Sequence, residues 1–465
     1  MLDDSLKERM DAYRVLLLWQ QDGSFIKESG LSPFAMELAL GVCRRHLYLQ
    51  YFIKSLVKKK PSVEVSTILE IGLFQMFFTE VPDHAAVATS VDLAKAANLH
   101  EGSARLVNAV LHAARRSGPP VLPPQRLRRV SIENSVPEWL VRRWFDVYGG
   151  DRAEALAKAT LERPVEWLRV NLQKTSVEEL AKKLGLDSSI PSLRDASQND
   201  EKNLSSLVPS AGSGQASRLS SKYDRFIQVP ADAKLKPILE SQSFANGEFS
   251  LQNPSAYEVV KLLDLKPGLK VWDACAAPGG KSALMAEMEP SLDILASDVS
   301  EFRVQKMHDV VDRLGLKNVH LECIDVLACN GGVAGVSPAE GVADAAGGRS
   351  EGEASPFDRI LLDVPCSNMG VIARRPESVY RLTPESIKEL SELQYKLLES
   401  AATRLAVGGI IVYATCSPDP TETTQVVNRF VKEHPEFARR GDAVLPGNLD
   451  ARFDGFFAQA LEYRK

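Results

Sequence analysis

Two cysteines and one acid carry the clearest chemical signal in this sequence. Cys366 lies in LLDVPCSNMG, three positions after Asp363 at the end of an apolar run, and Cys416 lies in VYATCSPDP, about 50 residues later. A thiolate is a strong nucleophile, but an ordinary thiol is only a few per cent ionised at neutral pH. The motifs therefore predict either covalent catalysis by an activated thiol or two buried structural thiols, and by themselves they leave both open.

The remaining cysteines indicate no second chemistry. The chain has six cysteines and no CxxC pair, so neither zinc binding nor thioredoxin-type redox chemistry is expected. We expect free thiols and no metal site, with Cys43, Cys323 and Cys329 as ordinary packing residues.

A glycine-rich turn in DACAAPGGKS, residues 273–282, follows a strand pattern and begins a helix pattern. Such a turn lets the backbone approach a ligand closely and directs helix N–H groups toward it. A nucleotide triphosphatase P-loop would need glycine where Cys275 stands, and Pro278 removes a backbone donor. We therefore interpret the segment as a loop for a nucleoside cofactor. The predicted loop residues are Cys275, Ala276, Ala277, Pro278, Gly279, Gly280 and Lys281.

Two further acids follow strand patterns. Asp298 comes 19 residues after Gly279 and closes LDILASD, the usual place for an acid that binds ribose hydroxyls. Asp325 closes VHLECID, where a carboxylate or its neighbours can meet an adenine edge. Either acid alone is equally consistent with a helix N-cap. Together with the glycine loop, the two acids favour a nucleoside cofactor.

The elements that must position these residues have the pattern of a parallel sheet. From about residue 250 onward, helical patterns separate most of five apolar strand patterns: LKVWDAC, LDILASD, VHLECID, FDRILLDVPC and GGIIVYATCS. This alternation is typical of an α/β, Rossmann-like domain, whose ligands bind at the carboxyl ends of the strands. Residues 1–116 instead have helical periodicity without strand signals, which predicts an all-α domain.

Composition divides the chain further. Residues 117–130 are rich in proline and arginine and are expected to form a basic linker. Residues 131–240 are expected to form an intermediate helical and α+β subdomain that binds RNA, and residues 241–465 to form the α/β domain. Segments 187–222 and 330–355 are rich in small and polar residues, so we expect flexible insertions there without catalytic residues.

Bulk composition excludes several classes of protein. No apolar run reaches the length of a membrane span, and the charged start MLDDSLKERM lacks the apolar core of a signal peptide, so we expect a cytoplasmic protein. The net charge of −5 argues against a globally basic nucleic-acid binder, but not against local patches. One basic cluster is either a solvated helix face or an RNA-backbone contact. Its members are Arg44, Arg45, Lys54, Lys58, Lys59 and Lys60.

Three motifs, DACAAPGGK, FDRILLDVPCSN and VYATCSP, resemble the signatures of Sun-type RNA 5-methylcytosine methyltransferases. Among these the chain most resembles the RsmB group, which methylates 16S rRNA, because ILEIGLFQMFFTEVPDHAAVATSVDLAK is similar to a NusB-like RNA-binding domain placed ahead of the catalytic domain. The resemblance implies an enzyme that acts on 16S rRNA with S-adenosylmethionine as its cofactor, and we expect a monomer. It places the cofactor on residues 275–281, with Asp298, Asp325 and Asp363.

The resemblance also implies roles for the two cysteines. In these RNA enzymes the Thr-Cys-Ser cysteine attacks carbon 6 of cytosine and the Pro-Cys cysteine assists release, which implies Cys416 as nucleophile and Cys366 as release residue. DNA cytosine methyltransferases attack with the Pro-Cys cysteine instead. Asp363 is expected to protonate or hydrogen-bond ring nitrogen 3, and Lys281 to contact the methionine carboxylate or the active-site acid. We expect the site to lower the pKa of Cys416.

One departure and two alternatives accompany this interpretation. The family usually has Gly or Ala where this chain has Asn368, which affects the details of substrate fit. The competing functions are the same chemistry on another RNA, such as tRNA, and an RNA-binding assembly or antitermination factor with an idle catalytic domain. The intact Asp363, Cys366 and Cys416 argue against the idle domain.

Overall fold

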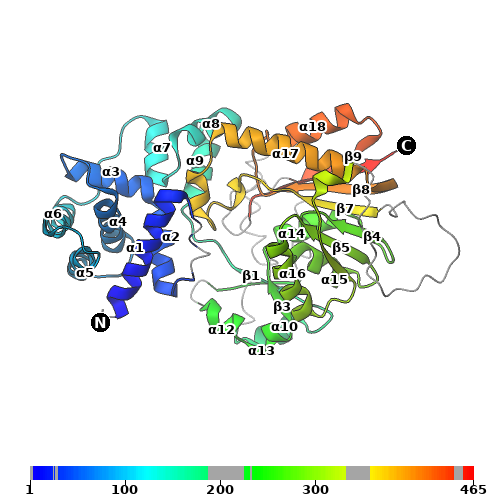
Figure 1. Ribbon diagram of the computed structural model, residues 1–465, viewed down its shortest axis with the longest axis horizontal. Helices are drawn as coiled ribbons and strands as arrows, with labels where there is room; N and C mark the ends of the chain where they lie inside the picture. Colours follow the sequence, from blue (N-terminus) through cyan, green and yellow to red (C-terminus); the bar gives the residue numbers. More distant parts are fainter. Residues whose placement is uncertain are drawn as a thin grey trace. The chain divides into compact units, whose positions relative to one another are not determined.

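The protein forms two compact units (Figure 1). The computed structural model describes residues 4–24, 26, 30–186, 225–230, 233–330, 357–444 and 454–464. The first unit comprises Met1–Pro164 and Val371–Leu382, and the second comprises Val165–Gly370 and Thr383–Lys465. The insertion predicted at 187–222 lies outside the described residues, as does the one predicted at 330–355 except for Asn330.

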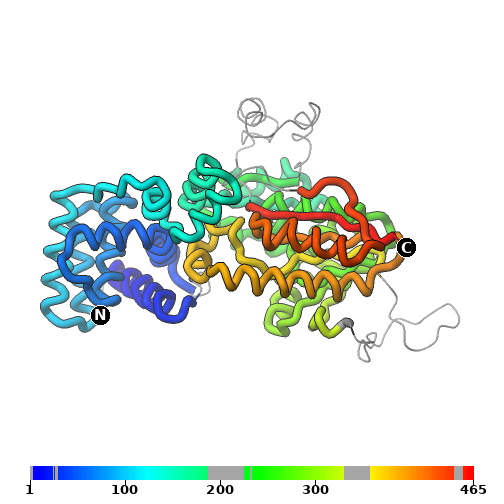
Figure 2. Tube along the Cα trace, turned by 90° about the horizontal axis from the view of Figure 1, so that it is seen from above, coloured from blue at the N-terminus to red at the C-terminus, as the bar shows by residue number. Residues whose placement is uncertain are grey.

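Where it is described, the first unit is helical, and the helices of residues 4–117 pack around one apolar core that includes Trp19 and Phe52 (Figure 2). The all-α N-terminal domain is thus confirmed. The segment expected to be a linker is partly helical, because its last proline is Pro124 and α7 begins at Arg126. The helices are α1 (Asp4–Asp22), α2 (Pro33–Arg44), α3 (His46–Leu56), α4 (Val63–Phe78), α5 (Asp83–Ala96), α6 (Glu101–Ser117), α7 (Arg126–Asn134), α8 (Glu138–Tyr148) and α9 (Gly150–Ala159).

A short segment that follows the Pro-Cys motif, residues 371–382, belongs to this first unit. The ring of its Tyr380 packs edge-on against the rings of Trp19 and His46, at centroid distances of 5.4 Å. The Tyr380 hydroxyl donates to the carbonyl oxygen of Ser135 at 2.9 Å. The chain that leaves the cysteine loop is therefore anchored among the N-terminal helices.

The second unit is built on a seven-stranded sheet in the order β6-β5-β4-β7-β8-β10-β9. The five strands from β6 to β8 in this order are parallel to one another, whereas β10 is antiparallel to both β8 and β9. The expected Rossmann-like, mostly parallel sheet is confirmed. The antiparallel edge was not foreseen, because the run RRGD hides the strand pattern of β9. The strands are β4 (Lys270–Asp273), β5 (Asp293–Asp298), β6 (Val319–Cys323), β7 (Phe357–Asp363), β8 (Leu405–Thr415), β9 (Phe437–Val444) and β10 (Phe457–Tyr463).

Alternate residues of the central strands enter two separate cores. Leu361 packs with side chains of α14, α15 and α16, whereas Ile360 and Leu362 pack with those of α17 and α18 on the other face (Figure 1). Because both faces are covered, these strands appear in the sequence as continuous apolar runs. The covering elements are α14 (Ser255–Lys261), α15 (Gly280–Met288), α16 (Glu301–Leu314), η3 (Val326–Asn330), α17 (Pro384–Ala402) and α18 (Thr424–Glu433).

A smaller antiparallel sheet, in the order β2-β1-β3, precedes the large one in sequence. Its core contains Leu168, Ile227 and Phe249. Its strands lie within or next to the segment expected to be an α+β subdomain, and β2 and β3 are only three residues long. The elements are β1 (Trp167–Val170), α10 (Val177–Lys183), β2 (Phe226–Gln228), α12 (Leu235–Leu239), α13 (Gln242–Ala245) and β3 (Phe249–Leu251).

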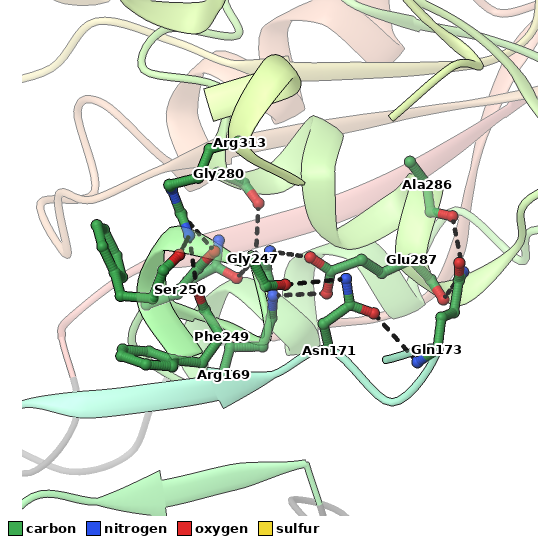
Figure 3. A network of polar contacts seen from close by, with 12 residues as sticks. Arg169, Asn171, Gln173, Gly247, Phe249, Ser250, Gly280, Ala286, Glu287 and Arg313 are labelled. Carbon is green, nitrogen blue, oxygen red and sulfur yellow. Dashed lines mark hydrogen bonds and ion pairs between the residues drawn. The ribbon is translucent and has the colours of Figure 1, made fainter. Parts of the chain in front are cut away.

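A buried ion pair joins the small sheet to α15 (Figure 3). The side chains of Arg169 on β1 and Glu287 on α15 are 1% and 2% exposed, with a closest N–O distance of 2.7 Å. Arg169 also donates to the carbonyl oxygen of Gly280, the first residue of α15, at 2.9 Å. Arg313 of α16 donates to the carbonyl oxygen of Phe249 at 3.0 Å. The small sheet thus holds the helix that begins at the predicted cofactor loop.

We predict that Arg169→Ala destabilises the second unit by about 3–5 kcal/mol, because it leaves the Glu287 carboxylate buried without its cation. The measurement is the urea dependence of hydrogen exchange in β1 and α15, which reports on this unit alone. Lys183→Ala is the matched control, since the Lys183 side chain is 48% exposed in its ion pair with Glu248. The control should cost less than about 1 kcal/mol. An Arg169→Ala protein as stable as the control would show that the ion pair does not hold the two parts together.

Candidate active site

The two cysteines lie together just beyond the carboxyl ends of neighbouring strands. Cys366 follows β7 and Cys416 follows β8, and their Sγ atoms are 2.8 Å apart. The pairing of β7 with β8 sets Asp363 opposite Ala414, so both loops start at the same edge of the sheet. Both cysteines stand at the ends of strand patterns in the sequence, and their proximity agrees with that placement. Two thiols beside an acid provide a nucleophile and a second group for proton exchange.

Lys281 and Asp363 form an ion pair beside the thiols. The Lys281 ammonium donates to Asp363 Oδ2, and the two side chains are 25% and 30% exposed. Burial disfavours the charged amine, but the charge and hydrogen bond of Asp363 outweigh it and raise the pKa of Lys281. Of the two contacts expected for Lys281, the structure contains the one with the active-site acid. Lys281 therefore connects the cofactor loop to the acid at the end of β7.

The local environment of Cys416 favours a protonated thiol. A hydrogen bond with Cys366, burial, and the charge of Asp363 raise the pKa of Cys416 well above its usual value. The expectation of a lowered pKa is therefore wrong for this state of the site, because only the positive charge of Lys281 acts in the lowering direction.

Asn368 contacts the Cys416 thiol directly. Its Oδ1 accepts from Cys416 Sγ at 3.2 Å, while its Nδ2 donates to the carbonyl oxygen of Cys366 at 3.1 Å. Its backbone φ of +60° lies in the left-handed region, which asparagine tolerates better than most residues. Sequence reasoning noted Asn368 only as a departure from the family. The structure shows that this residue bridges the two cysteine segments.

The predicted cofactor loop, residues 275–281, connects β4 to α15. The N–H of Ala276 donates to the carbonyl oxygen of Ser297 at 2.8 Å, which fixes the loop against the end of β5. Gly279 caps α15 with φ +92°, a conformation that favours glycine. The first turn of the helix directs its N–H groups toward this loop. Cys275 lies in the loop, and burial together with the charge of Asp273 raises the pKa of its thiol.

Asp273, the last residue of β4, is a functional candidate that sequence reasoning missed. It is 1% exposed, and burial raises the pKa of its carboxyl to about 7 against the hydrogen bond from Ser282. Its Oδ1 is buried and has no hydrogen-bond partner among the described residues. Asp273 opens the quoted motif DACAAPGGK, but its burial is a tertiary property that the motif does not encode.

The two other predicted acids differ in their surroundings. Asp298 ends β5 and is 4% exposed; its Oδ1 accepts from the N–H of Ser300 at 3.0 Å and pairs with Arg303 at 2.9 Å. Asp325 is exposed, and its Oδ1 accepts from the N–H of Leu327 at 2.9 Å within η3. The N-cap role considered for Asp325 is therefore present in the structure. Asp298 is the better-enclosed acid for binding a ligand.

Two further findings limit the classes of site. No group of three or more His, Cys, Asp or Glu side chains within the described ranges is placed to hold a metal ion. None of the described helices combines the length and apolar character that a membrane crossing requires.

Comparison with known proteins gives three family matches. The NusB family matches residues 16–116, the ferredoxin-like domain of RsmF/B-like methyltransferases matches residues 136–188, and the family described as 16S rRNA methyltransferase RsmB/F matches residues 260–445. These matches confirm the resemblance inferred from the motifs.

Individual relatives match over most of the chain. The chain is 34% identical to "Probable ribosomal RNA small subunit methyltransferase B" of Bacillus subtilis (strain 168), across 97% of this chain and 94% of that protein. It is 31% identical to "Ribosomal RNA small subunit methyltransferase B" of Pseudomonas putida (strain KT2440), across 86% and 80%. The solved structure of PH0851 is 22% identical, with a TM-score of 0.71 over 99% of both chains, which shows a shared fold. On these grounds, the chain belongs to the RsmB/F family of 16S rRNA methyltransferases.

Proposed function

We propose that this protein methylates carbon 5 of a cytosine in 16S rRNA, using S-adenosylmethionine and a transient covalent bond between Cys416 and the base. The observation that carries the proposal is the placement of two thiols, 2.8 Å apart, beside the Lys281–Asp363 ion pair. The names of the relatives, which are small-subunit ribosomal RNA methyltransferases, support the choice of RNA.

The residues around the glycine loop fit a cationic nucleoside cofactor. The charges of Asp363 and Asp298 act on Asp273, whose pKa is raised chiefly by burial, and one buried oxygen of Asp273 still has capacity to accept a hydrogen bond. S-adenosylmethionine, which carries a positive sulfonium, supplies the methyl group when it is bound. We assign the ribose hydroxyls to Asp298, the remaining cofactor contacts to residues 275–281 and Asp325, and a place beside the methionine portion to Asp363.

The first step makes carbon 5 of the base nucleophilic. Cys416 Sγ adds to carbon 6, and its proton passes to the carboxylate of Asp363. Asp363 then places that proton at ring nitrogen 3, where negative charge would otherwise develop. Lys281 holds the carboxylate in position during this exchange. The result is an enamine-like ring bonded to Cys416, in which carbon 5 is ready to accept the methyl group.

The second step releases the base. A base takes the proton from carbon 5, and the electron pair of that C–H bond forms the double bond between carbons 5 and 6 as the bond between carbon 6 and Cys416 Sγ breaks. The proton on ring nitrogen 3 returns through Asp363 to the sulfur. Cys366 is in hydrogen-bonding range of that sulfur and is our candidate for the group that exchanges protons during release.

The expectations of a monomer and of a cytoplasmic location stay predictions.

The function is tested by incubating the purified protein with unmodified 16S rRNA and labelled S-adenosylmethionine. The expected result is label at one cytosine, which resists bisulfite conversion only when the enzyme has acted. Unmodified tRNA serves as the competing substrate. Label confined to tRNA, or to a base position other than cytosine carbon 5, would refute the proposal.

The two cysteines should fail in different ways. Cys416→Ala should abolish methylation and the covalent RNA adduct, because the attacking atom is gone. Cys366→Ala should still form the bond and transfer the methyl group, but then retain the methylated base on Cys416. The measurement is a denaturing gel of protein mixed with labelled RNA and cofactor. An adduct that forms with Cys416→Ala and vanishes with Cys366→Ala would reverse the two roles.

Asp298→Ala should weaken S-adenosylmethionine binding by about ten- to a hundredfold. This change corresponds to the loss of charge-assisted hydrogen bonds that contribute roughly 1.5–3 kcal/mol. Isothermal titration calorimetry measures this directly. The matched control is Asp293→Ala, at the exposed opposite end of the same strand, which should leave the affinity unchanged. Equal affinity in the two variants would remove Asp298 from the cofactor site.

The basic cluster of the first unit divides into two groups. Arg44 donates to the carbonyl oxygen of Ala373 at 3.0 Å, and the Arg45 guanidinium lies 4.0 Å from the ring centroid of Phe78, so both are occupied within the unit. The remaining lysines are exposed and are our candidates for contacts with RNA phosphates. They are Lys54, Lys58, Lys59 and Lys60.

Replacing Lys58, Lys59 and Lys60 together with alanine should weaken rRNA binding and reduce its salt dependence. If each lysine neutralises one phosphate, the slope of log K against log salt should fall by about 2. A filter-binding salt series measures the slope, and cofactor affinity should stay unchanged. The control combines Lys7→Ala, Lys95→Ala and Lys158→Ala, three exposed lysines elsewhere on the unit. The same slope in both triple variants would exclude this cluster from the RNA contact.

A further inference from the structure

A buried glutamate lies behind the two cysteine loops. Glu422 is 0% exposed and belongs to the turn between β8 and α18. Its Oε1 accepts from the backbone N–H of Ser367 at 2.8 Å and from Nε2 of Gln394 at 3.0 Å. Its Oε2 accepts from the hydroxyls of Ser367 and Ser417. Both carboxylate oxygens are therefore occupied by hydrogen-bond donors.

The donors to Glu422 belong to the two segments that carry the thiols. Ser367 directly follows Cys366, and Ser417 directly follows Cys416. One carboxylate thus binds the neighbour of each cysteine. Gln394 extends the connection, because its Nε2 also donates to the carbonyl oxygen of Pro365 at 2.9 Å. The residues on both sides of Cys366 are held by the same small network.

The chemistry of these contacts suits a structural carboxylate. The four donors to Glu422 are neutral, and a carboxylate can only accept hydrogen bonds. In every contact the partner therefore donates and Glu422 accepts. Hydrogen bonds to a charged acceptor in a buried site are the stronger kind, and leaving such a group unsatisfied is costly. The network therefore has a strong preference for one arrangement of the two loops.

Backbone contacts fix the far end of the Cys366 loop. The N–H of Gly370 donates to the carbonyl oxygen of Cys416 at 2.8 Å, and the N–H of Gly455 donates to the carbonyl oxygen of Gly370 at 2.8 Å. A Cβ atom at Gly370 would lie 2.1 Å from the carbonyl oxygen of Gly455, so the approach requires glycine. The loop is tied to the Cys416 segment at Ser367 and again at Gly370.

From this geometry we infer that Glu422 is a positioning residue that sets the spacing of the Cys366 and Cys416 thiols. It acts through Ser367 and Ser417 and touches neither sulfur. The importance of Glu422 for methylation rests on the proposed function above, whereas its effect on the spacing of the thiols does not. The spacing and the methylation rate are therefore measured separately.

The spacing is measured by the exchange of the full-length protein with a glutathione buffer. One molecule of glutathione disulfide takes up two electrons, the two thiols lose their protons and form one disulfide, and two molecules of reduced glutathione result. Mass spectrometry of the linked peptides gives the equilibrium constant, which reports how closely the thiols are held. We expect the wild type to form the Cys366–Cys416 link and Glu422→Ala to lower the constant at least tenfold.

Glu422→Gln separates positioning from a need for negative charge. The glutamine oxygen can face the two N–H donors while its amide group donates to the two serine hydroxyls, which are able to accept. Its constant should therefore stay within about threefold of the wild type, and its kcat for methyl transfer should be largely restored. Glu422→Ala should lower kcat by about ten- to a hundredfold with little change in the KM for the cofactor, as expected for misplaced reacting groups.

Two kinds of variant control for a general loss of stability. Glu70→Ala removes an equally buried glutamate from the first unit and should leave the disulfide constant unchanged. If Glu422→Ala does not fold, Ser367→Ala and Ser417→Ala each remove one hydroxyl donor and should lower the constant about two- to fivefold.

Three results would overturn the inference: a wild type that forms no link, an unchanged constant in Glu422→Ala or in both serine variants, or a Glu422→Gln protein as impaired as Glu422→Ala. If the constants shift as expected but wild-type protein fails to methylate 16S rRNA, the positioning role stands and the proposed function falls.

Discussion

Strands β7 and β8 pair in parallel with Asp363 opposite Ala414, and the candidate site is assembled from the two loops that leave this pair. A shift of one residue would turn the side chains of a strand to the opposite face of the sheet. Here both faces are buried, with Leu361 in one core and Ile360 in the other, so such a shift would disrupt two cores at once. The short distance between the two sulfur atoms is thus secured by apolar packing well below them.

Two ion pairs in the second unit have different consequences because they differ in exposure. Arg169 and Glu287 are almost fully enclosed and bind each other in a two-bond arrangement, which links the small sheet to α15 and leaves no room for exchange with solvent. Lys281 and Asp363 are a quarter or more exposed, at the edge where ligands bind. The enclosed pair fixes the helix, and the exposed pair can exchange a proton with a substrate while the helix stays in place.

Sequence patterns predicted what depends on local order along the chain. The strand ends at Asp298 and Asp363, the glycine turn before α15 and the nearness of Cys366 to Cys416 follow from alternation and from the edge rule for parallel sheets. The antiparallel edge formed by β9 and β10 was not predicted, because the charged run RRGD hides the strand pattern of β9. Glu422 and Asp273 were missed for a different reason, since their significance lies in burial and in donors supplied by other segments. The direction of the Cys416 pKa was misjudged because it depends on neighbours that no motif specifies.

The raised pKa of Cys416 constrains how the proposed attack can proceed. If the thiol simply lost its proton to solvent, a thiolate would form near the Asp363 carboxylate, with Lys281 as the nearby cation, and like charges at short range are costly. Moving the proton from Cys416 to Asp363 avoids this, because the total charge of the three groups does not change. The move also converts Asp363 into the acid that ring nitrogen 3 requires. A site that keeps its nucleophile protonated at rest is therefore consistent with covalent catalysis, provided that the arriving base accepts the displaced proton as the sulfur attacks.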